Sequence, residues 1–242
     1  MRALSTQEML AVWERGIGQI PLERALALLG AACPECDRQT LATKSLGLRD
    51  ALLLQLREKV FGPYLTGYAV CRSCGEPLEV RLHVKDLVRS DSDVESPPIP
   101  FLTQGYELLL RPLNSLDLSE CAADNIGEPR RLFSRCLIAA SAGGVVVTEE
   151  QVPDELALAV MEDVVKADPR ADIQIALCCA ACRTIMHEAF DIVSFFWSEI
   201  DVWARRVLRE VHRLASAYGW SEGDILSMSP ARRQFYLEMS GA

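Results

Sequence analysis

The chain has 242 residues, of which 50% are apolar and 24% are charged, and its formal net charge is −9. This length is enough to bury one sizeable core or two modest ones. The acidic balance argues against a general nucleic-acid binder, which needs a basic surface, and against binding to anionic membranes. The longest apolar stretch, residues 137–147, is too short to span a bilayer. We therefore expect a cytoplasmic protein whose nine cysteines stay reduced.

Residues 1–63 are predicted to form a helical segment. Ser5 and Glu8 have the spacing of a capping box, which marks a helix start. Pro21 stands where a second helix would begin, because the missing N–H of proline costs nothing in the first turn. Apolar side chains four positions apart predict a third helix over residues 47–60.

Two short segments have the pattern strand, tight turn, strand. The first is residues 64–90 and the second is residues 171–193; each carries alternating apolar side chains on both sides of a Cys-x-x-Cys turn. We expect each segment to form a β-hairpin.

The insertion between the two hairpins, residues 91–170, is predicted to be mainly helical. Serine, aspartate and proline over residues 90–100 indicate a weak linker, and residues 106–111 resemble a strand. Residues 130–140 and 153–166 have helical patterns.

The C-terminal residues 194–242 are predicted to be helices. Apolar side chains from Phe196 to Tyr218 are three or four positions apart, which is the stripe of one long helix. Gly219 ends this helix, and Ser229 with Pro230 begins the last one.

The cysteines are the strongest chemical signal in the sequence. Three Cys-x-x-Cys pairs are present: Cys33/Cys36, Cys71/Cys74 and Cys179/Cys182. A structural zinc site needs four thiolates in a tetrahedron, and two intervening residues let both sulfurs of a pair face one point. The second and third pairs lie at the tips of the two expected hairpins. We therefore predict one structural Zn²⁺ bound by four ligands, Cys71, Cys74, Cys179 and Cys182, in an α+β fold built around a split zinc ribbon.

The separation of the two pairs weakens this signal. Cys74 and Cys179 are 105 positions apart, whereas compact four-cysteine motifs have about 15–20 intervening residues. The closure entropy grows only with the logarithm of the loop length, so the separation does not prohibit a shared site.

Other interpretations of the cysteines remain open. The thiols can pack as small apolar side chains, or a pair can act as a redox dithiol, although no thioredoxin-like pattern surrounds any of them. Cys33/Cys36 follows a helix and contains Pro34, so it is either a rival pair or incidental. His187 is an alternative ligand beside the second hairpin.

No catalytic signature accompanies the cysteines. The sequence lacks HExxH, GxSxG, a phosphate-binding loop and a dinucleotide fingerprint. We expect no enzymatic activity, no catalytic residues and no small-molecule substrate.

Aromatic and basic residues near the C-terminus exceed what one helix–core contact requires. Tryptophan, tyrosine and arginine are favoured anchors of protein interfaces. We predict a partner-binding surface at Trp197, Trp220, Arg232, Arg233, Phe235 and Tyr236.

Three blocks of the sequence together resemble a known family. The first is Gly47 to Gly62, with Arg49, Asp50 and Arg57; the second is Cys179-x-x-Cys182 followed by Phe190-Asp191 and Phe196-Trp197; the third is residues 212–226 with Arg232-Arg233-x-x-Tyr236-Leu237. Their order resembles the T4-type phage baseplate and baseplate-hub assembly proteins, especially those of bacterial contractile injection systems. Cys33-x-x-Cys36 departs from the pattern.

The resemblance implies a non-enzymatic structural or assembly role in the baseplate of a contractile, phage-tail-like particle. The implied partners are other baseplate or hub proteins, and the protein would enter the assembled particle or act only in its assembly. The alternative is a zinc-ribbon adaptor in transcription or RNA handling, which would need the basic face that this acidic chain lacks.

Overall fold

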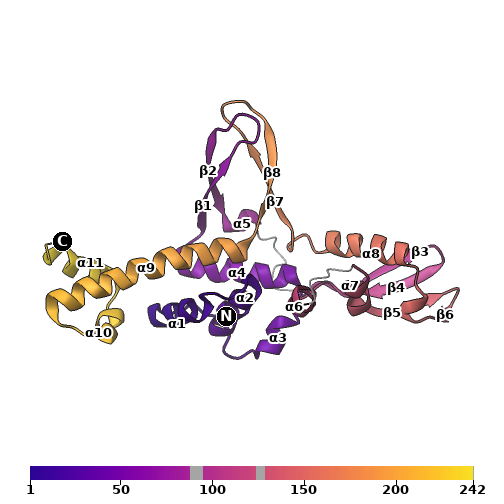
Figure 1. The fold of residues 1–242 in the computed structure, drawn as a ribbon, viewed down its shortest axis with the longest axis horizontal. Coiled ribbons are helices and arrows are strands. Elements are labelled where there is room, and N and C mark those ends of the chain that lie inside the picture. Colours follow the sequence, from indigo (N-terminus) through magenta and orange to yellow (C-terminus); the bar gives the residue numbers. More distant parts are fainter. Residues whose placement is uncertain (88–94, 124–128, 242) are drawn as a thin grey trace.

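The computed structural model describes residues 1–87, 95–123 and 129–241. Its elements are arranged along one long axis, with a stalk of two β-hairpins that rises from the middle (Figure 1). The longest helix, α9 (Ile192–Tyr218), extends from the base of the stalk toward one end, and a small sheet with its helices forms the other end. Mixed α and β structure is therefore confirmed.

Four helices form the N-terminal part of the body: α1 (Thr6–Gly16), α2 (Pro21–Ala32), α3 (Arg38–Ala42) and α4 (Leu46–Phe61). The predicted capping box is present, because the backbone N–H of Glu8 donates to the Ser5 hydroxyl and the backbone N–H of Ser5 donates to the Glu8 carboxylate. Pro21 occupies the first turn of α2, as expected. Their buried leucines, among them Leu28, Leu53 and Leu56, pack against Phe196 and Ile200 of α9, and each such side chain stabilises the fold by about 1.5–3 kcal/mol.

The contact between α4 and α9 positions both hairpins. The rings of Phe61 and Phe196 meet edge to face with centroids 6.0 Å apart. The buried Arg57 guanidinium donates to Glu199 of α9 at 2.8 and 2.5 Å, and to the carbonyl of Gly62 at 2.7 Å. Arg57 thereby joins the end of α4, the start of the first hairpin and α9.

The first hairpin directly follows α4, and the second directly precedes α9. Strands β1 (Tyr64–Val70) and β2 (Pro77–His83) pair antiparallel, and α5 (Val84–Leu87) follows them. Strands β7 (Ile173–Cys178) and β8 (Ile185–Phe190) pair antiparallel, and β8 leads into α9. Both hairpins were expected from the alternating apolar pattern.

The insertion between the hairpins contains more β-structure than expected. Strands β3 (Ile99–Thr103), β4 (Tyr106–Leu110), β5 (Leu137–Ala142) and β6 (Val145–Val146) form one antiparallel sheet. Helices α6 (Ser115–Ala123), α7 (Pro129–Cys136) and α8 (Asp154–Ala167) accompany it, with a 3₁₀ turn at Glu149–Gln151.

The predicted helix over residues 130–140 is wrong in its second half, because the chain turns into β5 at Leu137. Of the predicted linker at residues 90–100, residues 90–94 lie outside the described part. Leu108, Leu110 and Phe133 form a separate core with α8.

The C-terminal part packs on the second half of α9. Gly219 adopts a left-handed conformation and ends the helix, as expected. Helices α10 (Glu222–Ser227) and α11 (Pro230–Met239) then fold back, and Ile225, Leu226 and Leu237 form a third core with α9.

None of the described helices combines the length and apolar character that crossing a membrane requires.

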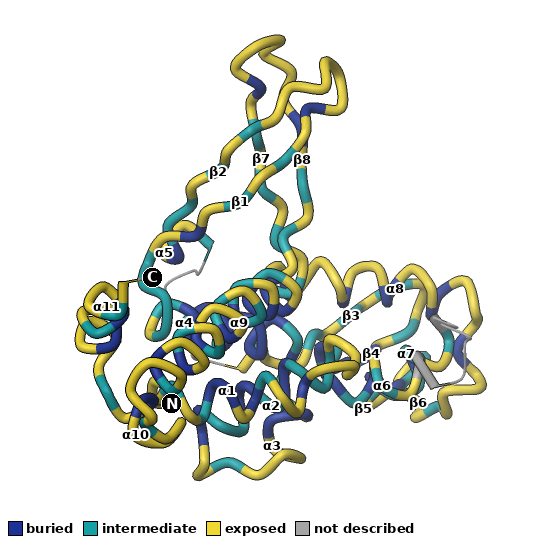
Figure 2. The backbone as a smooth tube through the Cα atoms, turned by 60° about the vertical axis from the view of Figure 1, so that its left-hand side comes forward, coloured by how far each residue is buried: buried dark blue, intermediate teal, exposed yellow. Residues whose placement is uncertain are grey.

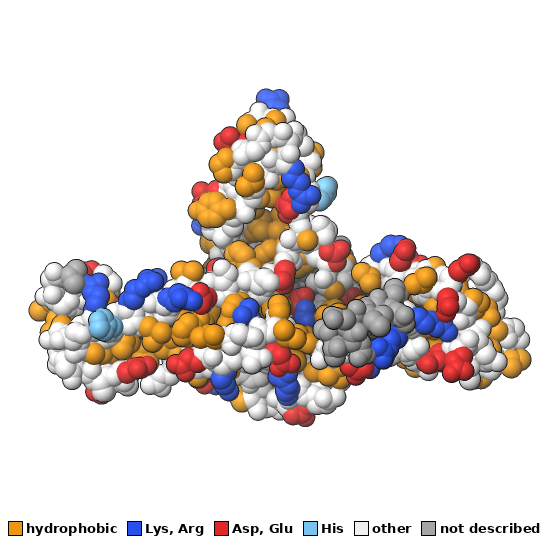
Figure 3. Space-filling view, in the orientation of Figure 1, with side chains coloured by type: hydrophobic (Ala, Val, Ile, Leu, Met, Phe, Trp, Pro, Cys, Tyr) orange, Lys and Arg blue, Asp and Glu red, His pale blue; other side chains and the backbone are white. Residues whose placement is uncertain are grey.

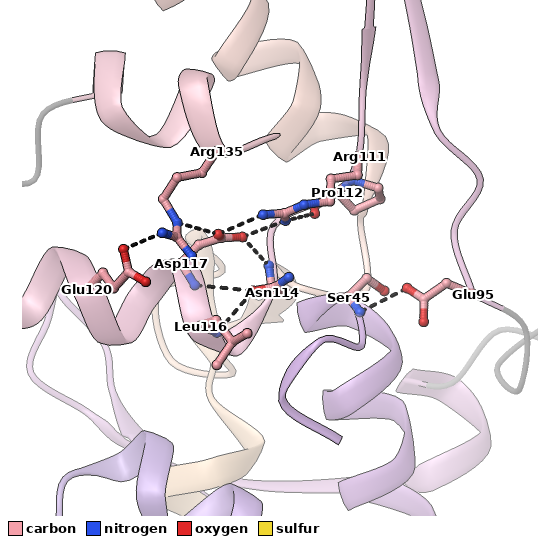
Figure 4. A network of polar contacts seen from close by, with 9 residues as sticks. All are labelled: Ser45, Glu95, Arg111, Pro112, Asn114, Leu116, Asp117, Glu120 and Arg135. Atoms are coloured by element: carbon pink, nitrogen blue, oxygen red, sulfur yellow. Dashed lines mark hydrogen bonds and ion pairs between the residues drawn. The ribbon is translucent and has the colours of Figure 1, made fainter. Parts of the chain in front are cut away.

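A buried aspartate organises the insertion (Figure 4). The Asp117 carboxylate accepts hydrogen bonds from Arg111 at 2.7 and 2.8 Å, from Arg135 at 2.8 Å and from the backbone N–H of Asn114 at 2.9 Å. Burial raises the pKa of Asp117, but these hydrogen bonds outweigh burial and hold the pKa below its usual value. Asp117 thus joins α6 to the ends of β4 and α7.

We predict that Asp117→Asn lowers the free energy of unfolding by about 3–5 kcal/mol, because two arginines lose their buried counter-charge. Glu120→Gln is the matched control, since Glu120 contacts the same Arg135 from an exposed position, and it should change stability by less than about 1 kcal/mol. Urea titration at neutral pH measures both.

The same carboxylate predicts an acid sensitivity. Because the pKa of Asp117 is depressed in the folded state, its contribution is complete above the pKa of an unfolded aspartate, about 3.9, and is lost as the pH falls below it. The unfolding free energy of Asp117→Asn should therefore fall less steeply on acidification than that of wild type. Equal slopes would contradict this assignment.

The first turn of α4 is bonded to the insertion at three successive backbone N–H groups. Ser45 donates to the Glu95 carboxylate at 2.8 Å, Leu46 donates to the carbonyl of Leu113 at 2.9 Å, and Gly47 donates to the Asp168 carboxylate at 2.9 Å. The free N–H groups of a helix N-terminus favour such anionic and carbonyl partners. Both ends of the insertion are thereby fastened to one helix turn.

Gly47 is required at this junction because a Cβ atom there would lie 2.0 Å from Oδ1 of Asp168. We predict that Gly47→Ala lowers the unfolding free energy by about 1–3 kcal/mol through overpacking. Gly30→Ala in α2 is the control: its Cβ would meet only Leu41 at 4.0 Å, so it should be neutral or stabilising by up to about 1 kcal/mol. Denaturant midpoints compare the two variants.

Candidate metal centre

Four cysteines converge at the top of the stalk. The sulfur atoms of Cys71, Cys74, Cys179 and Cys182 all lie within 4.8 Å of one another. Cys71 Sγ is 3.6 Å from Cys182 Sγ, and Cys74 Sγ is 3.7 Å from Cys179 Sγ. In each tip the first cysteine is buried and the second is exposed, and most of the backbone at the top of the stalk is exposed in Figure 2. The predicted convergence of these two pairs is confirmed.

The two turns have the same backbone geometry. The N–H of Gly75 donates to the carbonyl of Cys71 at 2.8 Å, and the N–H of Arg183 donates to the carbonyl of Cys179 at 2.8 Å. Each turn is closed by a second bond: Cys71 N–H to Glu76 at 2.9 Å, and Cys179 N–H to Thr184 at 3.0 Å. Two equivalent turns therefore present their thiols to one point from opposite hairpins.

The position after the second cysteine requires a positive φ in both turns. Gly75 has φ +77° and Arg183 has φ +61°. Glycine adopts this conformation without cost, whereas a residue with a Cβ atom is strained there. Gly75 is therefore explained by the turn, while Arg183 tolerates the same geometry within an otherwise identical set of hydrogen bonds.

The sulfur arrangement fits a tetrahedral zinc ion. With Zn–S bonds of about 2.3 Å, the sulfurs of an ideal tetrahedron are about 3.8 Å apart, close to the two Sγ–Sγ distances of 3.6 and 3.7 Å. Four thiolates are the donor set of closed structural zinc sites. The residues present therefore fit Zn²⁺ in donor type, number and proximity.

Hydrogen bonds favour the thiolate at one ligand in particular. The Thr184 hydroxyl, 3.3 Å from Cys182 Sγ, and the Thr184 backbone N–H lower the pKa of Cys182 to about 6. The Glu76 backbone N–H acts in the same sense on Cys74, but the neighbouring thiols outweigh it and raise the pKa of Cys74 to about 12. A thiolate is the form of cysteine that binds a metal, and the bonds from Thr184 favour that form at Cys182.

Little apolar packing holds the two hairpins together. Between them lies a cavity of about 150 Å³, lined by Leu65, Leu82, Ile175 and Phe190 among others, and apolar side chains gather at the base of the hairpins in Figure 3. Near the tips, Arg72 contacts Glu188 at 2.7 Å from an exposed position, which contributes at most about 1 kcal/mol. The four thiols are therefore the main link between the tips.

The remaining cysteine pair lies elsewhere. Cys33 follows α2 and is buried in the helical core, and Cys36 packs beside it. Within the described ranges, the four tip cysteines are the one group of three or more ligating side chains close enough to share an ion. His187 is exposed on β8 and is not part of this group.

Two residues of the predicted partner surface are buried in the structure. Trp197 is 8% exposed: it packs against Gly16, and Arg24 lies 4.5 Å above its ring. Arg233 is 3% exposed and donates to Glu210 and to the carbonyl of Met228. Both side chains are buried in the folded chain, so we expect the exposed part of the predicted surface to be formed by the other four residues.

The other four predicted residues lie together at the end of α9 and on α11. Trp220 and Tyr236 meet edge to face at 4.8 Å, Phe235 lies 6.0 Å from Tyr236, and the Arg232 guanidinium is 5.7 Å from the Tyr236 ring. Phe235 is 59% exposed. We call Trp220, Arg232, Phe235 and Tyr236 the C-terminal patch.

Two important sites were not found by sequence reasoning. One is the structural role of Arg57, which in the sequence is one of several charged residues of its helix. The other is the sheet of the insertion, whose turns at Gln104-Gly105 and Gly143-Gly144 all have positive φ. Such residue pairs between short apolar runs are the usual hairpin signal.

Comparison with known protein families gives a match over most of the chain. The family model described as T4 bacteriophage base plate protein matches residues 24–197, more than half of the chain. The chain belongs to this base plate protein family. The matched range contains both cysteine turns, α4, the insertion and the start of α9, and it ends before the C-terminal patch. No curated protein and no solved structure matches the chain.

The base plate protein is predicted to contain one zinc per chain. Replacing any one of Cys71, Cys74, Cys179 or Cys182 by serine should remove the metal and lower Tm by roughly 10 °C, because metal binding contributes directly to folding. Elemental analysis of freshly reduced, unchelated protein measures the metal, and thermal unfolding measures the stability.

Two matched controls accompany these variants. Cys178→Ser changes an exposed thiol directly beside the cluster, and Cys33→Ser changes a buried thiol outside it. Both should keep one zinc per chain. If Cys33→Ser removes the metal while Cys179→Ser retains it, the assignment of the ligands is wrong.

Proposed function

We propose that this base plate protein is a non-enzymatic structural or assembly component of the baseplate of a contractile, phage-tail-like particle, stabilised by one structural zinc. The observation that carries the proposal is the family match over residues 24–197, which includes every element that builds the stalk. Assembly partners are then other baseplate or hub proteins.

In this proposal the stalk is a split zinc ribbon. Bound zinc supplies a cross-link between two hairpin tips that are far apart in the sequence. The chain's own residues supply the rest: the turns orient the thiols, the Thr184 and Glu76 N–H groups support the thiolates, and the α4–α9 contact sets the spacing of the hairpin bases. The role of the metal is rigidity, which suits a projecting part with little apolar packing.

The C-terminal patch is the proposed docking surface. Exposed aromatic side chains beside an arginine are typical interface anchors, and further arginines, Arg205, Arg206, Arg209 and Arg213, lie on the exposed side of α9. Arg205 forms an ion pair with Asp201, and Arg206 forms one with Glu210, on the same helix. The remaining basic charge favours an acidic partner, chiefly through faster and more selective association.

The test compares assembled particles made with wild-type chain and with the double variant Arg232→Glu/Phe235→Asp. Because both side chains are exposed, the variant should retain zinc content and Tm near wild type. It should lower the yield of intact particles, counted by electron microscopy, and the recovery of baseplate proteins with the tagged chain at least tenfold, since losing one anchor typically costs about 2 kcal/mol or more.

Arg233→Glu is the contrasting control. Arg233 is buried and paired with Glu210, so this change should lower Tm. It shows how a folding defect, as opposed to a lost docking contact, affects assembly. Normal assembly by the folded double variant would place the docking surface elsewhere. If complete deletion of this protein leaves the yield of intact particles unchanged, the baseplate role itself is refuted.

A further inference from the structure

The outer face of the insertion sheet is an unpaired apolar surface. Leu108 and Leu110 of β4 point into the core with α8, so the alternate residues of the strand face the other way. That face has a groove of about 820 Å³, lined chiefly by apolar residues. Leu102 is 81% exposed and Val146 is 84% exposed. We call this surface the sheet groove; its outward apolar residues include Pro100, Leu102, Leu109, Ile138 and Val146.

The charges of the sheet groove have one sign. Its lining contains two carboxylates, Glu107 and Glu149, and no lysine or arginine. Glu107 accepts a hydrogen bond from the Ser141 hydroxyl at 3.2 Å, which holds its carboxylate on this face. The occupant that fits this chemistry is apolar and carries a cation.

The C-terminal patch has the complementary properties. It presents the exposed Phe235 ring, with Trp220 and Tyr236 beside it and the Arg232 guanidinium next to Tyr236. The patch lies at one end of the long axis and the sheet groove at the other (Figure 1). One chain therefore cannot bring them together, but two chains can.

We propose that the sheet groove of one base plate protein binds the C-terminal patch of a second copy, head to tail. This inference rests on the proposed docking role of the patch and names its partner. A single repeated contact covers both apolar surfaces, which a soluble protein rarely leaves exposed, and pairs Arg232 with Glu107 or Glu149. Because the two surfaces differ and lie at opposite ends, the contact is heterologous and generates a ring or an open chain of copies.

Complementation of two variants tests the head-to-tail contact. Phe235→Asp disrupts only the patch, and Leu102→Asp disrupts only the groove. In sedimentation velocity over a concentration series, the full-length wild type should form species larger than a dimer, and each variant alone should be monomeric at the same concentrations. An equimolar mixture should form a heterodimer and stop there, because one intact groove and one intact patch remain.

Val202→Asp is the control, since Val202 is 67% exposed on α9 and belongs to neither surface; it should associate like wild type. A wild type that stays monomeric throughout the series overturns the inference, as does a mixture that shows no heterodimer. The wild type can be monomeric while Arg232→Glu/Phe235→Asp still lowers the recovery of baseplate proteins with the tagged chain. In that case the proposed docking role stands, and only the second copy as its partner is refuted.

Discussion

The packing of α4 against α9 is the constraint on which the stalk depends. The first hairpin begins where α4 ends, and the second hairpin ends where α9 begins, so the distance between these helices is also the distance between the hairpin bases. Arg57 maintains it through bonds to Glu199 and to the carbonyl of Gly62, and the Phe61–Phe196 contact fills the space beside it. Without this contact, the bases of the two hairpins would not be held at the spacing that brings the two cysteine turns together.

The two halves of the cysteine cluster are far apart in the sequence. Closing this long connection costs little entropy once the bases of the two hairpins are held in place. The entropy of closure depends on the logarithm of loop length, and the insertion is itself ordered by the Asp117 network and its own core. In the proposed zinc ribbon, the metal would supply the stability that the narrow hairpins lack, since a two-stranded ribbon is marginally stable in water by itself. The fold of the body thus sets the spacing at which the four thiols meet.

The sequence predicted those parts of the fold whose signals are local. The capping box of Ser5 and Glu8 and the proline start of α2 both follow from signals within one helix turn, and the Cys-x-x-Cys spacing predicted the candidate ligands. Strand β5 was missed because Ala139 and Ala140 favour helices, and only pairing with β4 makes the segment a strand. Trp197 and Arg233 were misplaced because their burial depends on Gly16 and Glu210, which are distant in sequence.

The bonds between the first turn of α4 and the insertion have a mechanical consequence. Three adjacent backbone N–H groups, at Ser45, Leu46 and Gly47, connect to three separate points of the insertion. A pull on the sheet end is therefore shared by parallel hydrogen bonds and passes along the axis of α4 to the foot of the first hairpin.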